Sequence, residues 1–380
     1  MGKTKQMEGD SAEVKWEAKG ATTVAIVEGV FSESDTVTSG VLKAATLSDT
    51  PRVLLVADAN VVQRTEGLGS RIGRYLQANG IALASAPIVL PGGEKLKCDN
   101  LQSVMKICET ATKVRLGVRE VLIGLGGGTL LDTAGFAAAQ IRGGVNLVRI
   151  PTTTAAMMDG AFADTAAVNY NNVKNALKMP SHPVAAIIDP TFTKTVLDGV
   201  WRGGFSELVR HAAVRDATLL KRLAAAAPAI RERDDDLMHD LIRLGVASRI
   251  GRGDSDFSLW CAHRLESMSG YKLPHGYAVA IAICIDCAYA VERGLLKEGD
   301  QELICRTLAD CGALDGLAHS HHLLSQIDGL LKGLDDWRLD TGSEARTLPI
   351  GAGKGKPEDA PSRDSYRKVV GEFLAAYAGE

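Results

Sequence analysis

Aromatic residues, long apolar runs and basic runs are all scarce in this sequence, and each shortage excludes a class of protein. Phe, Tyr and Trp make up 5% of its 380 residues, too few to build a base-stacking surface. The formal net charge is −3 and no long basic run occurs, so no nucleic-acid partner is expected. No 18 consecutive residues are all apolar, so we expect no transmembrane helix and no membrane partner.

Cysteine is also scarce, with seven scattered residues. Cys284 and Cys287 are spaced as CxxC, but they lie in the apolar run 278–290, which is typical of small core residues in a reducing compartment. A zinc or redox role for the pair is the less favoured alternative. Residues 1–20 are polar, lack the apolar core of a signal peptide and are predicted to form a leader. We therefore expect a cytoplasmic protein.

The chain is long enough for two domains, and its first half alternates between strand and helix patterns. Short apolar runs bounded by turn residues predict buried parallel strands, and the segments between them have helical spacing. This alternation predicts a doubly wound, mostly parallel sheet in an α/β domain that spans 21–188. The expected strands are 22–30, 52–57, 82–90, 120–124 and 145–150, and the expected helices are 70–79, 100–113 and 129–140.

Beyond residue 189 the apolar spacing becomes helical and predicts an all-helical second domain, 189–380. Residues 340–365 are rich in glycine, proline and charge, and we expect them to form a mobile loop. The expected helices are 219–227, 236–250, 259–268, 277–292, 303–311, 323–331 and 366–377.

The strongest local motif is the cluster Gly126–Gly128, which joins an expected strand to an expected helix. Glycine lets the backbone approach a phosphate, and the first N–H groups of a helix attract anions. The cluster does not match GxGxxG, so an ordinary dinucleotide fingerprint is not indicated, and a plain tight turn is the alternative. Asp58 ends another strand, where an acidic group can accept hydrogen bonds from ribose or can cap a helix. The loop "PGGEKLK", Pro91–Lys97, carries charged side chains or is a solvated turn.

Glu207, His263 and His275 form the one metal-compatible set in plausible places. Glu207 is expected to begin a helical stretch, and the two histidines flank a turn near Gly270. One carboxylate and two imidazoles make a normal Zn²⁺ shell with an open position. Each residue alone is more often a surface or core group. The run His319–His322, "HSHH", is interpreted as a solvated helix start, with a metal cluster as the alternative.

Several motifs in order give the chain its resemblance to a known family. They are "GLGGGTLLDTAG", "IPTTTAAMMDGAF", "VKNALKMPSHP", "GGFSELVRHAAVRDA" and "DFSLWCAHRLESMSGYKLPHGYAVA". This combination, over roughly residues 50–290, resembles the dehydroquinate synthase-like sugar phosphate cyclases. The last block is most similar to the valiolone-synthase-like branch, which cyclises sedoheptulose 7-phosphate.

The resemblance implies an NAD-binding α/β domain, a helical domain that binds substrate and Zn²⁺ or Co²⁺, an active site in the cleft between them, and a homodimer. In that family NAD oxidises a substrate hydroxyl, phosphate is eliminated, the hydride returns and an aldol step closes the ring. By resemblance, the NAD-contacting positions are Asp58, Asn60, Glu94, Lys97, Gly126, Gly127, Gly128, Asp132, Thr152, Thr153 and Thr195. The catalytic and substrate positions are Asp159, Lys174, Asn175, Arg210, Arg252, Asp256 and His263, and the metal positions are Glu207 and His275.

The chain departs from the family at several of these positions. Leu259 stands where the family has a metal histidine, so we expect a weakened site. His263, one helical turn later, either completes the shell or keeps its place beside substrate. Thr165 replaces a pocket lysine, and Gly143 aligns with an arginine that reaches the neighbouring subunit's phosphate site, with Arg142 adjacent. Arg210, Asp256 and Tyr277 replace a lysine, an asparagine and a glutamate.

Three functions are compatible with this pattern. The favoured one is an NAD-dependent cyclase-like lyase acting on a phosphorylated sugar or related polyol, with a changed pocket. The second is an NAD-dependent metal polyol or alcohol dehydrogenase, suggested by "LPHGYAVAIA". The third is a non-catalytic homologue that retains NAD binding.

Overall fold

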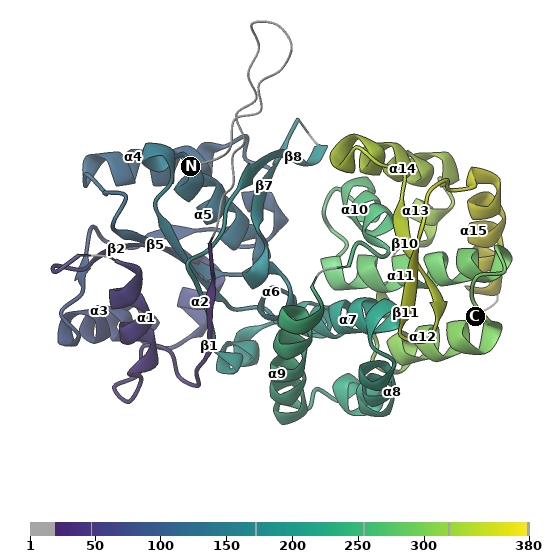
Figure 1. Cartoon of the computed structure of the whole chain (residues 1–380), viewed down its shortest axis with the longest axis horizontal. Coiled ribbons are helices and arrows are strands. Elements are labelled where there is room, and N and C mark those ends of the chain that lie inside the picture. The colour runs from purple at the N-terminus through teal and green to yellow at the C-terminus, as the bar shows by residue number, and fades with distance from the viewer. Residues whose placement is uncertain (1–19, 47, 172, 254, 318–319, 378–380) are drawn as a thin grey trace, which may run out of the picture.

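The computed structural model describes residues 20–46, 48–171, 173–253, 255–317 and 320–377. Within them an α/β half, up to Ile188, lies beside a helical half that follows it (Figure 1). The predicted leader lies outside the described residues except for Gly20, and so does His319. The domain boundary near residue 189 stays a prediction.

A seven-stranded sheet forms the centre of the α/β half. Its strand order is β1-β9-β6-β5-β2-β3, and β4 also pairs with β2. These pairings are parallel, which confirms the predicted doubly wound sheet. The strands are β1 (Thr23–Ile26), β2 (Arg52–Asp58), β3 (Ala82–Leu83), β4 (Ile88–Leu90), β5 (Val121–Gly126), β6 (Asn146–Pro151) and β9 (Ala185–Ile188).

Helices cover both faces of this sheet, because alternate side chains of each strand point to opposite faces. Leu54 and Val56 of β2 pack with α4 and α5, whereas Val53 and Leu55 pack in the core that holds α1 and α3. The strands are therefore apolar on both faces, as buried parallel strands are. The helices are α1 (Val37–Ala45), α2 (Ala59–Arg64), α3 (Leu68–Ala78), α4 (Gln102–Lys113), α5 (Gly128–Gln140) and α6 (Thr154–Met158).

The strand order reverses direction between β2 and β5, and this point positions the site. From β2 the chain builds outward through β3 and β4, and from β5 it builds the other way through β6 and β9. Ligands of open α/β sheets bind at such a switch point, beyond the carboxyl ends of the strands. Here β2 ends at Asp58 and β5 ends at Gly126. The acidic motif and the glycine cluster are thus neighbours.

The helical half packs around α11, which is buried along most of its length and runs through the half in Figure 1. This helix is long and apolar enough to cross a membrane, but 72% of it is buried inside the protein, so it is a core helix. Cys284 and Cys287 are buried within it. The helices are α7 (Asp198–Arg215), α8 (Ala217–Arg231), α9 (Asp235–Arg252), α10 (Leu259–Met268), α11 (His275–Glu292), α12 (Glu298–Asp310), α13 (His321–Leu324), α14 (Ile327–Thr341) and α15 (Arg363–Tyr377).

Two antiparallel hairpins differ from the sequence-based expectations. The segment predicted as a mobile loop contains β10 (Arg346–Gly351) and β11 (Lys354–Glu358). Buried Arg346 fixes this hairpin, because its guanidinium bonds Glu358 of β11 and the Tyr366 hydroxyl of α15. The second hairpin, β7 (Thr165–Tyr170) and β8 (Val173–Pro180), lies outside the main sheet and was not predicted.

The prediction that Glu207 begins a helix was wrong, because Glu207 lies in the middle of α7. Gly203 and Gly204, which precede Glu207, are also helical, and both are needed for close packing. A Cβ on Gly276 of α11 would lie 2.1 Å from the Cα of Gly203, so α7 and α11 touch through their backbones. A Cβ on Gly204 would lie 2.5 Å from the Thr154 Cβ of α6.

Candidate active site

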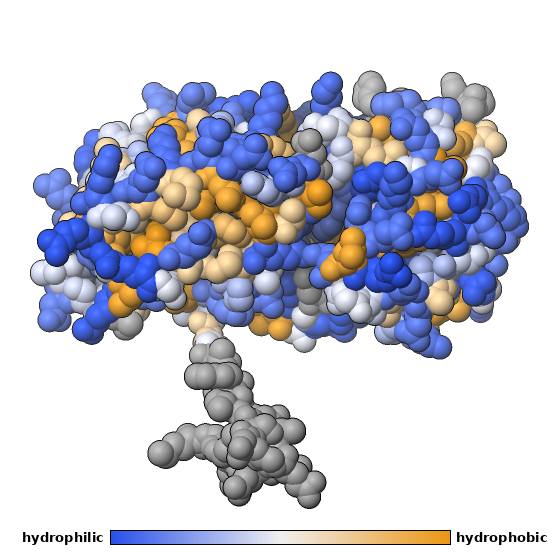
Figure 2. Space-filling view, turned by 90° about the horizontal axis from the view of Figure 1, so that it is seen from above, coloured by the Kyte–Doolittle hydropathy of each residue, from blue (hydrophilic) through white to orange (hydrophobic). Residues whose placement is uncertain are grey.

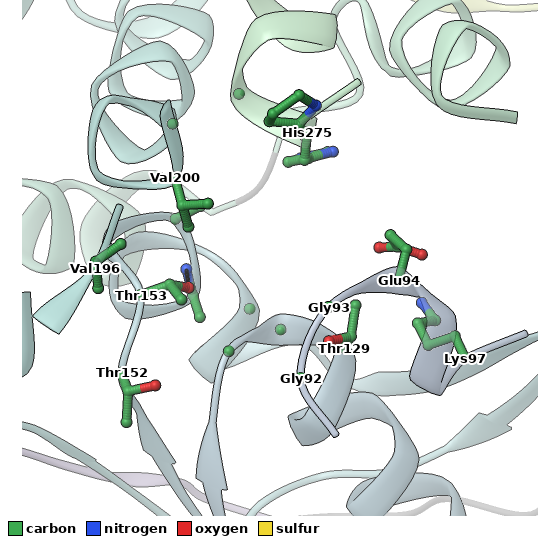
Figure 3. Close-up of a pocket in the computed structure, with 18 of the residues that line it drawn as sticks. Gly92, Gly93, Glu94, Lys97, Thr129, Thr152, Thr153, Val196, Val200 and His275 are labelled. Carbon is green, nitrogen blue, oxygen red and sulfur yellow. Dashed lines mark hydrogen bonds between the residues drawn. The ribbon is translucent and has the colours of Figure 1, made fainter. Parts of the chain in front are cut away.

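A cavity of about 630 Å³ lies between the two halves, at the switch point of the sheet. Its α/β side is made by the ends of β2, β5 and β6 and by the loop after β4. Its helical side is made by α7, α10 and the start of α11. Figure 3 shows His275 on one side of the open space, opposite Thr129, Glu94 and Lys97. A ligand in this cavity would contact both halves.

Glycines keep the α/β wall of the cavity thin. A Cβ on Gly92 would lie 2.4 Å from an Asp58 carboxylate oxygen, and a Cβ on Gly127 would lie 3.0 Å from the Thr153 Cγ2. Gly127 precedes α5, which begins at Gly128 and has its first turn at the cavity. The N-terminus of a helix carries a partial positive charge and free N–H groups, so this wall suits an anion such as a pyrophosphate.

The structure brings together nearly all the residues predicted to contact NAD. Gly126 is the exception: it packs under the wall, where a Cβ would meet Leu130 and Asp58. Asp58 caps α2 by accepting a 2.7 Å hydrogen bond from the Asn60 amide, so the capping alternative also holds. The predicted residues that line the cavity are Asp58, Asn60, Glu94, Lys97, Gly127, Gly128, Asp132, Thr152, Thr153 and Thr195.

Lys97 organises the border between the glycine-rich wall and the substrate end. Its ammonium donates to Asp132 Oδ2 at 2.7 Å and to Asn175 Oδ1 at 2.8 Å. The side chain is 4% exposed, so its charge depends on these partners. Asn175 adopts a left-handed φ of 54° and its amide donates to Asn169, which fixes the turn of backbone that presents it.

Five charged side chains form a continuous chain of hydrogen bonds along the far wall of the cavity. The Arg210 Nε donates to Glu207 Oε2 at 2.7 Å, and Glu207 Oε1 lies 2.9 Å from His275 Nε2. The other ring nitrogen of His275 lies 3.1 Å from Glu266 Oε2, and Lys174 donates to Glu266 Oε1 at 2.7 Å. We call this set, Arg210–Glu207–His275–Glu266–Lys174, the ionic chain. It joins α7, α11 and α10 of the helical half to β8.

The two cavity histidines have opposite protonation behaviour. Burial alone would lower the pKa of His275, but the carboxylates of Glu266 and Glu207 raise it to about 10. Burial and the nearby Lys174 charge lower the pKa of His263 to about 3. The rings lie 6.3 Å apart between centroids. His275 is thus a cation and His263 a neutral base at physiological pH.

The remaining predicted substrate residues divide into two groups. Asp159, Lys174, Asn175 and His263 line the cavity, whereas Arg210 lies behind Glu207. Arg252 lies outside it: its guanidinium is 3.0 Å from Asp216 on the surface, and its backbone carbonyl bonds Arg215. Asp256 also lies outside, where its carboxylate accepts from the Thr347 amide. Two substrate positions inferred from resemblance therefore do not reach the cavity in this structure.

The departures from the family pattern also have definite places. Arg142 donates to the Leu116 carbonyl at 2.8 Å, so its side chain packs against its own subunit. Thr165 begins β7, and Tyr277 packs against Gly199 and Gly316 in the helical half. Leu259 does line the cavity, one turn before His263 on α10. His321 and His322 of the HSHH run are exposed on α13, away from the cavity.

Sequence analysis missed Glu266, Arg249 and Lys272. Glu266 binds both His275 and Lys174, and Arg249 lies 3.3 Å from Asp159, while Lys272 lines the cavity. The spacing His263-x-x-Glu266 was a usable signal for Glu266, because side chains three apart on a helix are neighbours.

Comparisons with known proteins agree with this geometry. The sequence-family model for the 3-dehydroquinate synthase N-terminal region matches residues 87–202. The family model for the C-terminal region matches residues 255–326. A 3-dehydroquinate synthase from a Picosynechococcus species is 32% identical over 345 residues, covering 85% of this chain and 90% of that protein. The corresponding protein from Nostoc punctiforme is 29% identical and covers 84% of this chain and 89% of its own length.

Solved structures show the same fold. A 2-epi-5-epi-valiolone synthase from Streptomyces hygroscopicus, with NAD⁺ and Zn²⁺ bound, superposes with a TM-score of 0.82 at 21% identity, covering 96% of this chain and 99% of that one. A 2-deoxy-scyllo-inosose synthase complexed with carbaglucose-6-phosphate, NAD⁺ and Co²⁺ has a TM-score of 0.76 at 18% identity, with 97% and 99% covered.

The shared length, the two matched regions and the cavity at their junction give one conclusion: the chain belongs to the 3-dehydroquinate synthase family.

Proposed function

We propose that the chain is an NAD-dependent, cyclase-like lyase that acts on a phosphorylated sugar or a related polyol. The observation that carries the proposal is the cavity itself. It joins a glycine-rich wall at the switch point, which suits a dinucleotide, to a neutral imidazole on the opposite half. The family supports the same assignment, since its matched members are 3-dehydroquinate synthases. Asp58, Gly127 and Thr153 would hold NAD, and His263 lines the same cavity.

The first chemical step would be oxidation of a substrate carbinol. Bound NAD⁺ would supply the hydride acceptor for the carbinol C–H, and the neutral ring of His263 would accept the hydroxyl proton. The resulting ketone acidifies the neighbouring C–H, so a leaving group such as phosphate can depart with its electron pair. The bound cofactor would also supply the hydride that reduces the ketone again, so the overall reaction would consume no NAD.

The polyol dehydrogenase alternative shares the first step and omits the rest. One observation keeps it as a second candidate, namely that the cavity lacks two cations that the family resemblance implies. Arg252 lies outside the cavity, and the uncharged Thr165 stands in place of a lysine. Phosphate is held most strongly by charge-assisted bonds from such cations. The two functions differ in whether NADH accumulates.

We also propose that the protein is a cytoplasmic homodimer, as the family resemblance implies. Figure 2 shows a broad apolar area over the α/β half, seen from the side where Figure 1 places α4 and the β7–β8 hairpin. Met105 of α4 and Val173 of β8 are among the exposed apolar residues of these elements. A second copy could cover this area.

NAD binding should depend on Gly127. Replacing it with valine places a branched side chain against Thr153 and blocks close approach of a phosphate. Calorimetry should show a specific NAD site in the natural protein and a loss of affinity of at least roughly 100-fold in Gly127→Val. Gly40→Val is the control, because Gly40 lies on α1 with open space around it. Absence of NAD binding by the natural protein at millimolar concentration would disprove the assignment.

Turnover should leave the cofactor unchanged. With candidate seven-carbon and six-carbon sugar phosphates, release of inorganic phosphate is expected without net absorbance of NADH at 340 nm. Accumulation of NADH in step with substrate loss would instead establish the dehydrogenase. Failure of both signals across polyols and sugar phosphates, with NAD still bound, would support the non-catalytic homologue.

His263→Gln should lower kcat by roughly 10²–10⁴-fold and leave NAD affinity unchanged, because only the proton acceptor is removed. Since the pKa of His263 is about 3, this base stays unprotonated as the pH falls from 8 to 5. The kcat/KM profile should therefore show no His263 limb near pH 6.5, where an ordinary histidine titrates. His322→Gln, exposed on α13, is the control. Unchanged kcat in His263→Gln would remove His263 from the mechanism.

Light scattering tests the dimer. The expected mass is about twice the 40.2 kDa of one chain at micromolar concentration. Met105→Asp should shift the mass toward the monomer, because a charge on a covered apolar surface is costly. Val37→Asp, at an exposed site on α1, should leave the mass unchanged. A monomeric natural protein would refute the proposal.

A further inference from the structure

We propose that this chain works without a resident metal ion, and that the ionic chain holds the place where a metal centre of Glu207, His275 and a third ligand would form. The inference concerns the same cavity as the proposed function. It is tested by metal content and thermal stability, whereas the proposed function is tested by NAD binding and turnover. Either proposal can therefore fail while the other holds.

The third ligand position carries no donor atom. Leu259 lines the cavity on the face of α10 that also carries His263, and its side chain is a hydrocarbon. Zinc sites in proteins usually have three or four protein ligands. Glu207 and His275 alone supply two. The described part of the chain contains no group of three or more His, Cys, Asp or Glu side chains arranged to hold a metal ion.

The two remaining candidate ligands are already engaged by protein partners. Glu207 uses one oxygen for the Arg210 Nε, at 2.7 Å, and the other for His275 Nε2, at 2.9 Å. His275 faces a carboxylate at each ring nitrogen, since Nδ1 lies 3.1 Å from Glu266. A metal-ligating histidine also bonds a carboxylate through one nitrogen, but its other nitrogen must offer a lone pair to the metal. Here that direction holds Glu207 Oε1, the second candidate ligand, so an ion could enter only if this contact opened.

Charge balance points the same way. Glu207 and Glu266 are 3% and 1% exposed, so both need cations close by. Arg210 lies against Glu207, and Lys174 lies against Glu266. Arg210 cannot lose its proton in a protein, so its positive charge stays next to the carboxylate a metal would need. A divalent cation would enter a place where the negative charges are already compensated.

The ionic chain also does the structural work of a metal. A metal centre ties together the elements that supply its ligands. The ionic chain links α7 through Glu207, α11 through His275, α10 through Glu266 and β8 through Lys174. The two halves are therefore joined at the cavity wall by these side chains.

Completion of the shell by His263 is the competing arrangement. It would need His263, His275 and Glu207 around one ion, with the contact between His275 Nε2 and Glu207 opened to admit that ion. His263→Ala separates the two cases, because it would remove the metal from such a shell and would leave the metal content unchanged in a protein that holds none.

Elemental analysis by mass spectrometry is the first test, on the full chain produced in medium supplemented with Zn²⁺ and Co²⁺. The expected content is below about 0.1 ion per chain, with no shift in melting temperature on adding either metal or a chelator. Leu259→His should gain roughly one ion per chain and a chelator-sensitive rise in melting temperature, because it restores a third ligand beside Glu207 and His275. Leu259→Phe, which adds a ring without a donor, should gain neither.

Near-stoichiometric metal in the natural protein would overturn the proposal, and its loss in His263→Ala would establish the His263 shell instead. A Leu259→His protein that folds and binds NAD but takes up no metal would overturn the assignment of the missing ion to Leu259.

The ionic chain has its own test in Glu266→Gln, which removes the charge between His275 and Lys174. The melting temperature should fall by roughly 5 °C, and equally so with and without chelator. Glu292→Gln, whose exposed pair with Lys368 is solvated, should change it by about 1 °C or less. A melting temperature unaffected by Glu266→Gln would show that the ionic chain does not hold the two halves together.

Discussion

Two carboxylates, Glu207 and Glu266, are buried where the α/β and helical halves meet, and the surrounding elements are arranged by their need for cations. A buried charge left without its partner costs about 3–5 kcal/mol, so each cation must be delivered to a fixed place. Arg210 comes from the same helix as Glu207, His275 from the start of α11, and Lys174 from the β7–β8 hairpin. The hairpin lies outside the main sheet, yet the Lys174–Glu266 ion pair places Lys174 in the cavity wall. Lys178, on the same strand, forms a second ion pair with Asp340 of α14.

The same charges divide the work of the two histidines. His275 lies between two carboxylates and gains a positive charge, whereas His263, beside Lys174, stays neutral. Neighbouring groups whose pKa values are driven apart are typical of acid and base pairs in active sites. Only the arrangement of α10, α11 and β8 produces this difference, since both residues are histidines on neighbouring helices. The neutral ring is the one positioned to accept a proton.

The sequence was most informative where local chemistry and local structure coincide. The strand–Gly126-Gly127-Gly128–helix pattern predicted both elements and a place at the cavity wall, because the glycines act within a few residues. It failed where long-range contacts decide. The β10–β11 segment is polar and rich in glycine, and contacts with residues outside it hold it in place, such as the bonds of Arg346 to Tyr366 and of Thr347 to Asp256. Glu266 took part in the site through His275 and Lys174, which are distant in sequence. Arg252 and Asp256 matched family positions, but local bonds to Asp216 and Thr347 turn them away from the cavity.

The backbone contact between Gly203 and Gly276 sets a fixed spacing for everything built on it. Glu207 stands one turn after Gly203 on α7, and His275 is adjacent to Gly276 on α11. Because no side chain separates the two helices there, the contact fixes how closely the helix positions that carry Glu207 and His275 approach each other. Charges such as Arg210 and hydrocarbons such as Leu259 can therefore be exchanged without moving the frame. The contact sets the spacing of α7 and α11 by backbone atoms, so the side chains around it can differ in chemistry on one common frame.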